Sequence, residues 1–207
     1  MNTNKEDYIK AIYELGGYRE LIPNKAIAGE LRVSPPSVSE MIKKLVEEDY
    51  LDYREYRGVQ LTKKGILEAR KIRRRHLLWE VFLVEKLGYS WLEVDEEAEI
   101  LEHISSDRLV ERLDAFLGRP QHCPHGSPLV LDSYEDSLSL LKARPGTSYR
   151  LLRIKDSPDV LEFCDQWGLA IGDEIRLLAR EEDEVRLARG QDIIRLGQDL
   201  AGKIYLK

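Results

Sequence analysis

The sequence predicts a mainly α-helical protein that begins with a winged helix-turn-helix, continues as a helical domain and ends in a small β-barrel. Three observations carry this prediction. Three short helices and a hairpin signal fill the first 62 residues, helical periodicity continues from there to about residue 118, and short segments separated by glycines follow residue 145. With 207 residues and 43% hydrophobic content, the chain is long enough for one large domain or two to three small ones.

The first third contains three predicted helices. Residues 5–15 place apolar side chains at helical spacing and stop at two glycines, and a second helix over residues 24–31 begins at Asn24, a favourable N-cap. The third helix starts with Ser34 as its cap and Pro35 at its first position, where the missing N–H costs nothing. The break of three residues between the second and third helices is typical of a helix-turn-helix.

A β-hairpin is predicted directly after the third helix. Residues 50–54 and 59–62 alternate in polarity around Glu55-Tyr56-Arg57-Gly58, with Gly58 available for positive φ. Helix, turn, helix and hairpin make a winged helix-turn-helix, which binds DNA by laying its second helix in the major groove. The alternative is a helical bundle whose hairpin has no role in binding. The candidate DNA-binding residues are Ser37, Ser39 and Glu40 for base reading, Lys43, Lys44, Arg54 and Arg57 for the backbone, and Ser34 and Pro36 at the helix start.

The charge distribution fits this division. The formal net charge is −6, which argues weakly against a general polyanion binder. Residues 1–75, however, hold 16 Lys and Arg against 12 Asp and Glu, whereas the rest of the chain holds 16 against 26. A basic first third attached to an acidic body is typical of a DNA-binding module joined to a regulatory part, although many neutral helical proteins split by this much.

A helix that follows the long predicted helix of residues 63–87 carries the chemistry of a metal site. Glu99, Glu102 and His103 have the spacing i, i+3, i+4 and therefore share one helix face, where two carboxylates and an imidazole can meet one ion. Oxygen and nitrogen ligands without a thiolate favour Mn(II), Fe(II) or Zn(II). The alternative is a solvated acidic face.

Two further signals are weaker. Glu80 lies in an apolar stretch one turn after His76, so the pair either shares a cation or forms an exposed ion pair. Cys123 and His125 flank Pro124 and can chelate a metal, but a Cys-Pro-His tripeptide alone is not specific.

The region of residues 92–118 reads as two helices with more apolar surface than a small domain requires, which suggests a dimer interface. Residues 129–144 read as a linker or short helix.

Cellular location is predicted from what the chain holds. Two distant cysteines fit a reducing cytoplasm, and no stretch approaches the ~18 apolar residues of a membrane span. The sequence therefore predicts a soluble cytoplasmic protein with no membrane partner.

With these motifs in place, the chain resembles the diphtheria toxin repressor family of metal-dependent transcriptional regulators, in particular its manganese-responsive branch from Gram-positive bacteria. The likeness spans essentially the whole chain. It is carried by residues 6–13, 34–38, Arg75-His76, 99–103, Cys123-Pro124-His125-Gly126 and 168–173. The resemblance implies three domains: a DNA-binding domain at 1–72, a helical metal-binding and dimerisation domain at 73–144, and a barrel like the ferrous-transport A (FeoA) domain at 145–207.

The resemblance also implies two metal sites and a function. Asp7, Glu99, Glu102 and His103 would form one site; His76, Glu80, Cys123, His125 and a barrel carboxylate, Asp159 or the neighbouring Asp156 with Asp159 favoured, would form the other. Oxygen ligands at Asp7 and Glu99, where iron-responsive relatives have sulfur, favour Mn(II), with Fe(II) possible and Zn(II) able to occupy the sites in vitro. Lys10, where some relatives have Glu, favours a single ion at the first site.

The implied function is a homodimeric, metal-dependent repressor of metal-uptake genes that binds a double-stranded operator when its metal is bound. Two rivals remain from the residues alone. Cys123, with His125 beside it, suits a winged-helix redox sensor. Glu99, Glu102 and His103 could instead activate water in a metallohydrolase, but no second catalytic motif supports an enzyme.

Overall fold

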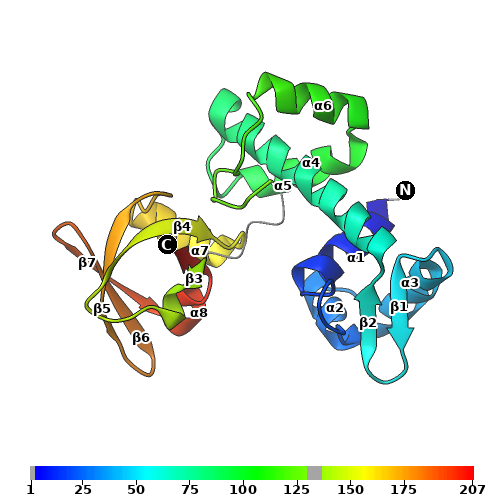
Figure 1. Ribbon diagram of the computed structural model, residues 1–207, viewed down its shortest axis with the longest axis horizontal. Helices are drawn as coiled ribbons and strands as arrows, with labels where there is room; N and C mark the ends of the chain where they lie inside the picture. The colour runs from blue at the N-terminus through cyan, green and yellow to red at the C-terminus, as the bar shows by residue number, and fades with distance from the viewer. Residues whose placement is uncertain (1–2, 130–136) are drawn as a thin grey trace. The chain divides into compact units, whose positions relative to one another are not determined.

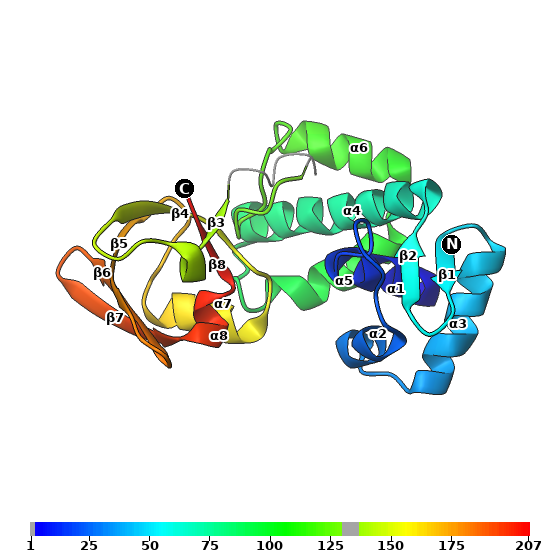
Figure 2. The same cartoon turned by 60° about the horizontal axis from the view of Figure 1, so that its bottom comes forward.

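The computed structural model describes residues 3–129 and 137–207, which fall into two compact units (Figures 1 and 2). The first unit holds the described residues 3–76 and 102–105, and the second holds the described residues 77–101, 106–129 and 137–207. The division into three domains, with boundaries after residues 72 and 144, stays a prediction. One division of the structure falls inside a continuous helix, and the end of a later helix packs with the first unit.

The first unit is built on three packed helices, α1 (Thr3–Glu14), α2 (Asn24–Leu31) and α3 (Pro35–Glu47). Their buried side chains include Ile9, Ile12, Ile27, Ile42 and Leu45. Ser34 caps α3 by accepting a hydrogen bond from the backbone N–H of Ser37, as its sequence predicts. Asn24 is not the cap of α2, however, because it already lies in the helix and Pro23 occupies the cap position.

The wing is the antiparallel hairpin of β1 (Leu51–Arg54) and β2 (Gly58–Leu61), seen beside α3 in both views (Figures 1 and 2). Gly58 is required here: its φ is +113°, and a Cβ would lie 2.1 Å from the carbonyl oxygen of Ile22. Ile22 in turn pairs with Val59. The wing is therefore attached to the loop before α2 as well as to α3.

Helix α4 (Lys63–Leu87) is the longest element and starts at a Thr62 cap, whose hydroxyl accepts the backbone N–H of Gly65. Its part in the second unit packs with α5 (Val94–Ile104) and α6 (Asp107–Phe116) through two apolar clusters. One of these contains Leu78, Val81, Val110, Leu113 and Cys123, and the other contains Leu83, Val94 and Ala98. Both helices fall inside the region where the sequence predicts two.

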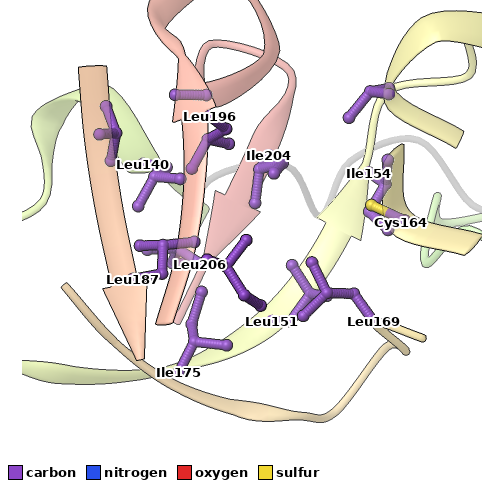
Figure 3. Close-up of a cluster of buried hydrophobic side chains, with 14 of the residues drawn as sticks. Leu140, Leu151, Ile154, Cys164, Leu169, Ile175, Leu187, Leu196, Ile204 and Leu206 are labelled. Atoms are coloured by element: carbon purple, nitrogen blue, oxygen red, sulfur yellow. The ribbon is translucent and has the colours of Figure 1, made fainter. Parts of the chain in front are cut away.

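The C-terminal part of the second unit is a curved antiparallel sheet with strand order β3-β8-β4-β5-β6-β7. Its strands are β3 (Leu138–Ser139), β4 (Ser148–Ile154), β5 (Glu174–Arg180), β6 (Glu184–Arg189), β7 (Asp192–Gly197) and β8 (Ile204–Leu206), and its helices are α7 (Pro158–Gln166) and α8 (Gln198–Ala201). Buried side chains from β4, β5, β6, β7 and β8 pack together with Cys164 of α7 in one hydrophobic core (Figure 3). The small barrel predicted from glycine-separated strands is thus present.

Some local expectations need correction. Sequence reasoning misses β3 and α8, which are too short to leave a periodic pattern, and Leu140–Lys142 forms a 3-10 turn where a linker or short helix is expected. Part of that predicted linker, residues 130–136, lies outside the described residues. Among the described helices, none is both long and apolar enough to cross a membrane.

Candidate metal centre and nucleic-acid interface

His103, near the end of α5, is held between two carboxylates of α1. Its Nδ1 donates to Oε2 of Glu6 at 2.8 Å, and its Nε2 lies 2.9 Å from Oδ1 of Asp7. A carboxylate only accepts hydrogen bonds, so Glu6 fixes the proton of the imidazole on Nδ1. Nε2 is then the nitrogen that faces Asp7, and a histidine whose Nδ1 is held by a carboxylate in this way commonly binds a metal through Nε2.

Glu102, one residue earlier, is fully buried. Its Oε2 accepts hydrogen bonds from His76 Nδ1 at 2.7 Å and from Lys10 Nζ at 2.9 Å. Burial alone would raise the pKa of Glu102, but the hydrogen bond from His76 and the charge of Lys10 outweigh burial and hold that pKa below its usual value. The carboxylate is therefore ionised at neutral pH.

The second oxygen of Glu102 marks where a cation fits. Oε1 is buried, makes no hydrogen bond, and lies 3.6 Å from Nε2 of His103. A buried carboxylate oxygen without a partner is costly unless something neutralises it. Oδ1 of Asp7 lies 2.9 Å from the same imidazole nitrogen, so the donor set is two carboxylate oxygens and one nitrogen, which suits Mn(II), Fe(II) or Zn(II).

The structure therefore brings together Asp7, Glu102 and His103, three of the four residues predicted for the first site. Glu99, the fourth, precedes Glu102 and His103 on α5 by three and four residues, as predicted. It lies in the part of α5 that belongs to the second unit. Its membership of the site stays a prediction.

The second cluster lies within the second unit and combines three buried side chains. Glu80 of α4, Cys123 and His125 place ligand atoms within 4.8 Å of one another. Nδ1 of His125 lies 3.6 Å from Oε1 of Glu80 and 3.6 Å from Oδ2 of Asp156, and neither ring nitrogen makes a hydrogen bond. An imidazole buried without hydrogen bonds between two carboxylates and a thiol fits a divalent cation.

The ionisation of this cluster reflects its burial. Burial raises the pKa of Cys123 to about 11, and the carboxylate of Glu80 adds to the effect. Burial would lower the pKa of His125, but Asp156, Cys123 and Glu80 overcome that effect and raise it. Desolvation and the charge of Glu80 raise the pKa of Asp156 to about 7, although 29% of its side chain is exposed. Without a cation, the cluster retains protons that a bound metal would displace.

Asp159 and His76, two predicted members of the second site, have other hydrogen-bond partners in the structure. Asp159 forms an ion pair with Lys203 and accepts a hydrogen bond from Ser157, and the Lys203 bond lowers its pKa. Asp156, which follows β4 directly, is the barrel carboxylate 3.6 Å from Nδ1 of His125, and the choice between Asp159 and Asp156 as the ligand stays a prediction. His76 does lie one turn before Glu80 on α4, but its Nδ1 is used in the hydrogen bond to Glu102.

The loop carrying Cys123 and His125 is fixed to the barrel. The carbonyl of His125 accepts a hydrogen bond from the N–H of Ile154 at the end of β4. Gly126 has a φ of +80°, and a Cβ there would lie 2.2 Å from the carbonyl oxygen of Leu152. Only glycine permits this close approach, which sets the position of the imidazole.

The predicted DNA-binding residues all lie on the exposed surface of α3, its N-terminal cap and the wing. They are Ser34, Pro36, Ser37, Ser39, Glu40, Lys43, Lys44, Arg54 and Arg57. Several already have local partners: Ser39 donates to the carbonyl of Pro35, and Lys44 forms an i, i+4 pair with Glu40 at 2.7 Å. Their roles in binding stay a prediction.

Sequence reasoning missed two residues of the first site. Glu6 is noticed only as part of a family motif, and Lys10 only as a departure from some relatives, yet they contact His103 and Glu102 directly. Their positions at i and i+4 on α1, on either side of Asp7, are the one signal that could have suggested a shared face.

Comparison with known families accounts for nearly the whole chain. Residues 1–59 match the iron dependent repressor N-terminal DNA binding domain, and residues 62–130 match the iron dependent repressor metal binding and dimerisation domain. Residues 138–207 match the FeoA domain.

Individual relatives agree. The chain is 37% identical to the HTH-type transcriptional regulator MntR of Listeria welshimeri over 142 residues, which cover 69% of this chain and 92% of that protein. It is 31% identical to the iron-dependent repressor IdeR of Mycobacterium leprae over 186 residues, covering 86% of this chain and 77% of that protein.

Solved structures extend the likeness over the full length. The manganese regulator SloR is 40% identical with a TM-score of 0.85 and covers 100% of this chain and 99% of its own. ScaR with bound Zn²⁺ is 41% identical with a TM-score of 0.87, covering 99% of both chains, and a manganese-dependent repressor in complex with manganese is 35% identical with a TM-score of 0.89, covering 98% of both. The chain therefore belongs to the diphtheria toxin repressor family of iron- and manganese-dependent regulators, and to its manganese-responsive branch.

Proposed function

We propose that the protein is a homodimeric transcriptional repressor whose binding to an operator depends on a divalent cation, Mn(II) in the first place and Fe(II) as an alternative. The observation that carries this proposal is the buried, unpartnered Oε1 of Glu102 beside Nε2 of His103 and the carboxylate of Asp7. The relatives are named as manganese or iron regulators, and the donor set suits both ions.

The chemistry that a bound cation supplies is neutralisation of the carboxylates that converge on His103. Asp7 belongs to α1 of the winged module, whereas Glu102 and His103 belong to α5. In the absence of the cation, the carboxylates of Asp7 and Glu102 repel one another, so only contacts such as those of Glu6 and Lys10 hold α1 against the end of α5. When they are neutralised, we expect α1 and the winged module to keep one orientation.

A dimer with both winged modules in one orientation presents two recognition helices at a fixed separation. Two such helices enter successive major grooves about 34 Å apart along the DNA. Exposed apolar side chains on α5 and α6, such as Ile100 and Phe116, support self-association. The genes most directly linked to such a sensor are those for uptake of the same metal, and the site of action would be the cytoplasm.

The test is a set of DNA-binding isotherms on one operator fragment with Mn(II), Fe(II), Zn(II) or a chelator. We expect each metal to increase affinity over the chelator sample, with Mn(II) and Fe(II) effective at micromolar free concentrations. A chelated sample that binds the fragment as tightly as the Mn(II) sample would contradict the proposal. A response to peroxide that is lost in Cys123→Ser, with no effect of chelation, would favour the redox alternative instead.

A further inference from the structure

Helix α1 contributes more to the first site than the Asp7 carboxylate. Glu6 and Lys10 lie on either side of Asp7 along the helix, and each contacts one of the two α5 residues of the site. Glu6 is buried, and the Lys10 side chain is 12% exposed. All of these groups belong to the first unit.

Each contact is made to one of two candidate ligand atoms. Glu6 accepts the proton of His103 Nδ1, whereas Lys10 and His76 donate to Oε2 of Glu102. Of the other two atoms, Nε2 of His103 lies 2.9 Å from Oδ1 of Asp7 and 3.6 Å from Oε1 of Glu102, which has no hydrogen bond. Two ligand atoms that face each other at this distance can share one cation.

We propose that Glu6 and Lys10 are positioning residues that select Nε2 of His103 and Oε1 of Glu102 as the metal ligands, and that they change metal affinity in opposite directions. This inference rests on the metal site of the proposed function. It adds that the winged module sets the affinity and the number of ions at the site, as well as responding to them.

Glu6 raises affinity. A carboxylate that accepts the Nδ1 proton fixes the ring orientation and makes Nε2 a better donor to a cation. Arg75 lies 3.8 Å from the other oxygen of Glu6, which restrains that carboxylate further. Removing such a partner of a metal-bound histidine commonly costs 10–100-fold in metal affinity.

Lys10 lowers affinity. Its ammonium already neutralises part of the Glu102 charge, so a cation at Oε1 gains less from that carboxylate and is repelled by the nearby positive charge. Because Lys10 also donates to Oε2, Glu102 offers only Oε1 to a metal. The ammonium of Lys10 occupies the space beside Oε2, where a second ion would otherwise bind. The site therefore takes one ion.

The experiment titrates the full-length protein with Mn(II) and follows free Mn(II) by electron paramagnetic resonance, with no DNA present. The variants are Glu6→Gln, Glu6→Ala and Lys10→Met. Glu30→Gln and Lys25→Met, which change the same charges at exposed positions of α2, are matched controls. Asp7→Ala identifies the binding event that belongs to the first site.

We expect Glu6→Ala to weaken that event 10–100-fold, Glu6→Gln to weaken it less, and Lys10→Met to strengthen it several-fold, with both controls like the wild type. If Lys10→Met and Glu6→Gln both weaken binding, or neither changes it, the inference is overturned. If Asp7→Ala leaves the wild-type isotherm unchanged, the proposed metal site itself fails, which is a different result.

A second readout guards against a folding defect. In the protein loaded with Zn(II), ¹⁵N chemical shifts of the His103 ring report which nitrogen binds the metal and which carries the proton. We expect Nε2 to bind the metal in the wild type, and a mixture of Nε2-bound and Nδ1-bound forms in Glu6→Gln, which keeps the size of the side chain. Binding through Nε2 alone in a folded Glu6→Gln variant would show that Glu6 does not select the ligand atom.

Discussion

Among single residues, Asp7 links the winged module to the proposed cation most directly. Its side chain is partly buried and its Oδ1 lies 2.9 Å from Nε2 of His103. Asp7→Ala should abolish the stimulation of DNA binding by Mn(II) because one of the converging oxygen ligands is lost, while the core of α1, which does not include Asp7, still folds. A gel-shift titration with and without Mn(II) measures this.

The control for that variant is the chelated wild type. We expect Asp7→Ala in Mn(II) to match it in affinity, with an unchanged circular dichroism spectrum. Full Mn(II) stimulation in a folded Asp7→Ala protein would remove Asp7 from the site.

The protonation of the Cys123 thiol should make metal affinity at the second cluster depend on pH. Its pKa is raised to about 11, so the apo cluster holds the proton at neutral pH, and a metal that binds the thiolate must displace it. Affinity at the second cluster should therefore rise as pH rises from 6.5 to 8.5, by about 10-fold per unit for each proton released.

Isothermal titrations with Zn(II) in buffers of different ionisation heat count the released protons. Cys123→Ser should release at least one proton fewer, whereas Cys164→Ser, at the other buried cysteine, which packs in the barrel core, should leave the count unchanged. Equal proton release from wild type and Cys123→Ser would exclude the thiol as a ligand.

At this scale, sequence spacing predicts which residues share a helix face but not which atom each one offers. Glu102 and His103 could be named from their spacing with Glu99, and Asp7 from the family resemblance. The use of His76 by Glu102, and the hydrogen bond from His103 to Glu6, depend on how α1, α4 and the end of α5 meet. Such long-range contacts leave no periodic signal.

Among the elements, the loop from Gln121 to Leu129 depends on a glycine. A Cβ at Gly126 would meet the backbone of Leu152, so Gly126→Ala should push the loop off β4 and cost on the order of 3 kcal/mol of stability from strain and overlap. Urea unfolding measures that cost. The variant should also weaken metal binding at the second cluster.

Gly118→Ala is the matched control, because Gly118 has a φ of +75° with nothing within 4 Å of a built Cβ. It carries the backbone strain alone and should lose on the order of 1 kcal/mol. If both variants lose the same amount, the close approach at Leu152 is not what fixes the loop.

The exposed arginine of the wing should contribute to the salt dependence of DNA affinity. Arg57 lies in its exposed turn beside Tyr56, which is 96% exposed. Arg57→Ala should remove one phosphate contact and flatten the plot of log affinity against log salt by about one unit. Fluorescence anisotropy between 50 and 300 mM salt gives the slope. Lys142→Ala, an exposed cation outside the winged module, should leave the slope unchanged.

Elements with strong local signals were predictable within one or two residues. Ser34, Pro35 and Thr62 define helix starts by their own chemistry, and α4 follows the bounds that its pattern predicts. The two-residue β3 exists because β8 is beside it, so its own sequence carries no sign of it.

For the whole molecule, linkage connects metal and DNA. If Mn(II) raises operator affinity 100-fold, the coupling free energy is about 2.7 kcal/mol, and the operator must tighten Mn(II) binding by the same factor. Measuring Mn(II) affinity with and without a saturating operator duplex tests this. A scrambled duplex of equal length is the control, and operator binding that leaves Mn(II) affinity unchanged would contradict a metal-gated repressor.

The overall domain order was predictable because the motifs are specific in combination, and the family matches over residues 1–59, 62–130 and 138–207 support it. The division of the structure inside α4 was not, since helical periodicity runs through residues 76 and 77 without a break.

The backbone N–H of Ile154 donates a hydrogen bond to the carbonyl of His125, so both the loop and the barrel are needed to position the second cluster. Listeria MntR aligns over 92% of its own length but only 69% of this chain, so about a third of this chain lies outside that alignment. A shorter regulator without a barrel would lack both the strand that anchors this imidazole and the aspartate that follows it. The cluster and the barrel are thus expected to be inherited or discarded as a single module.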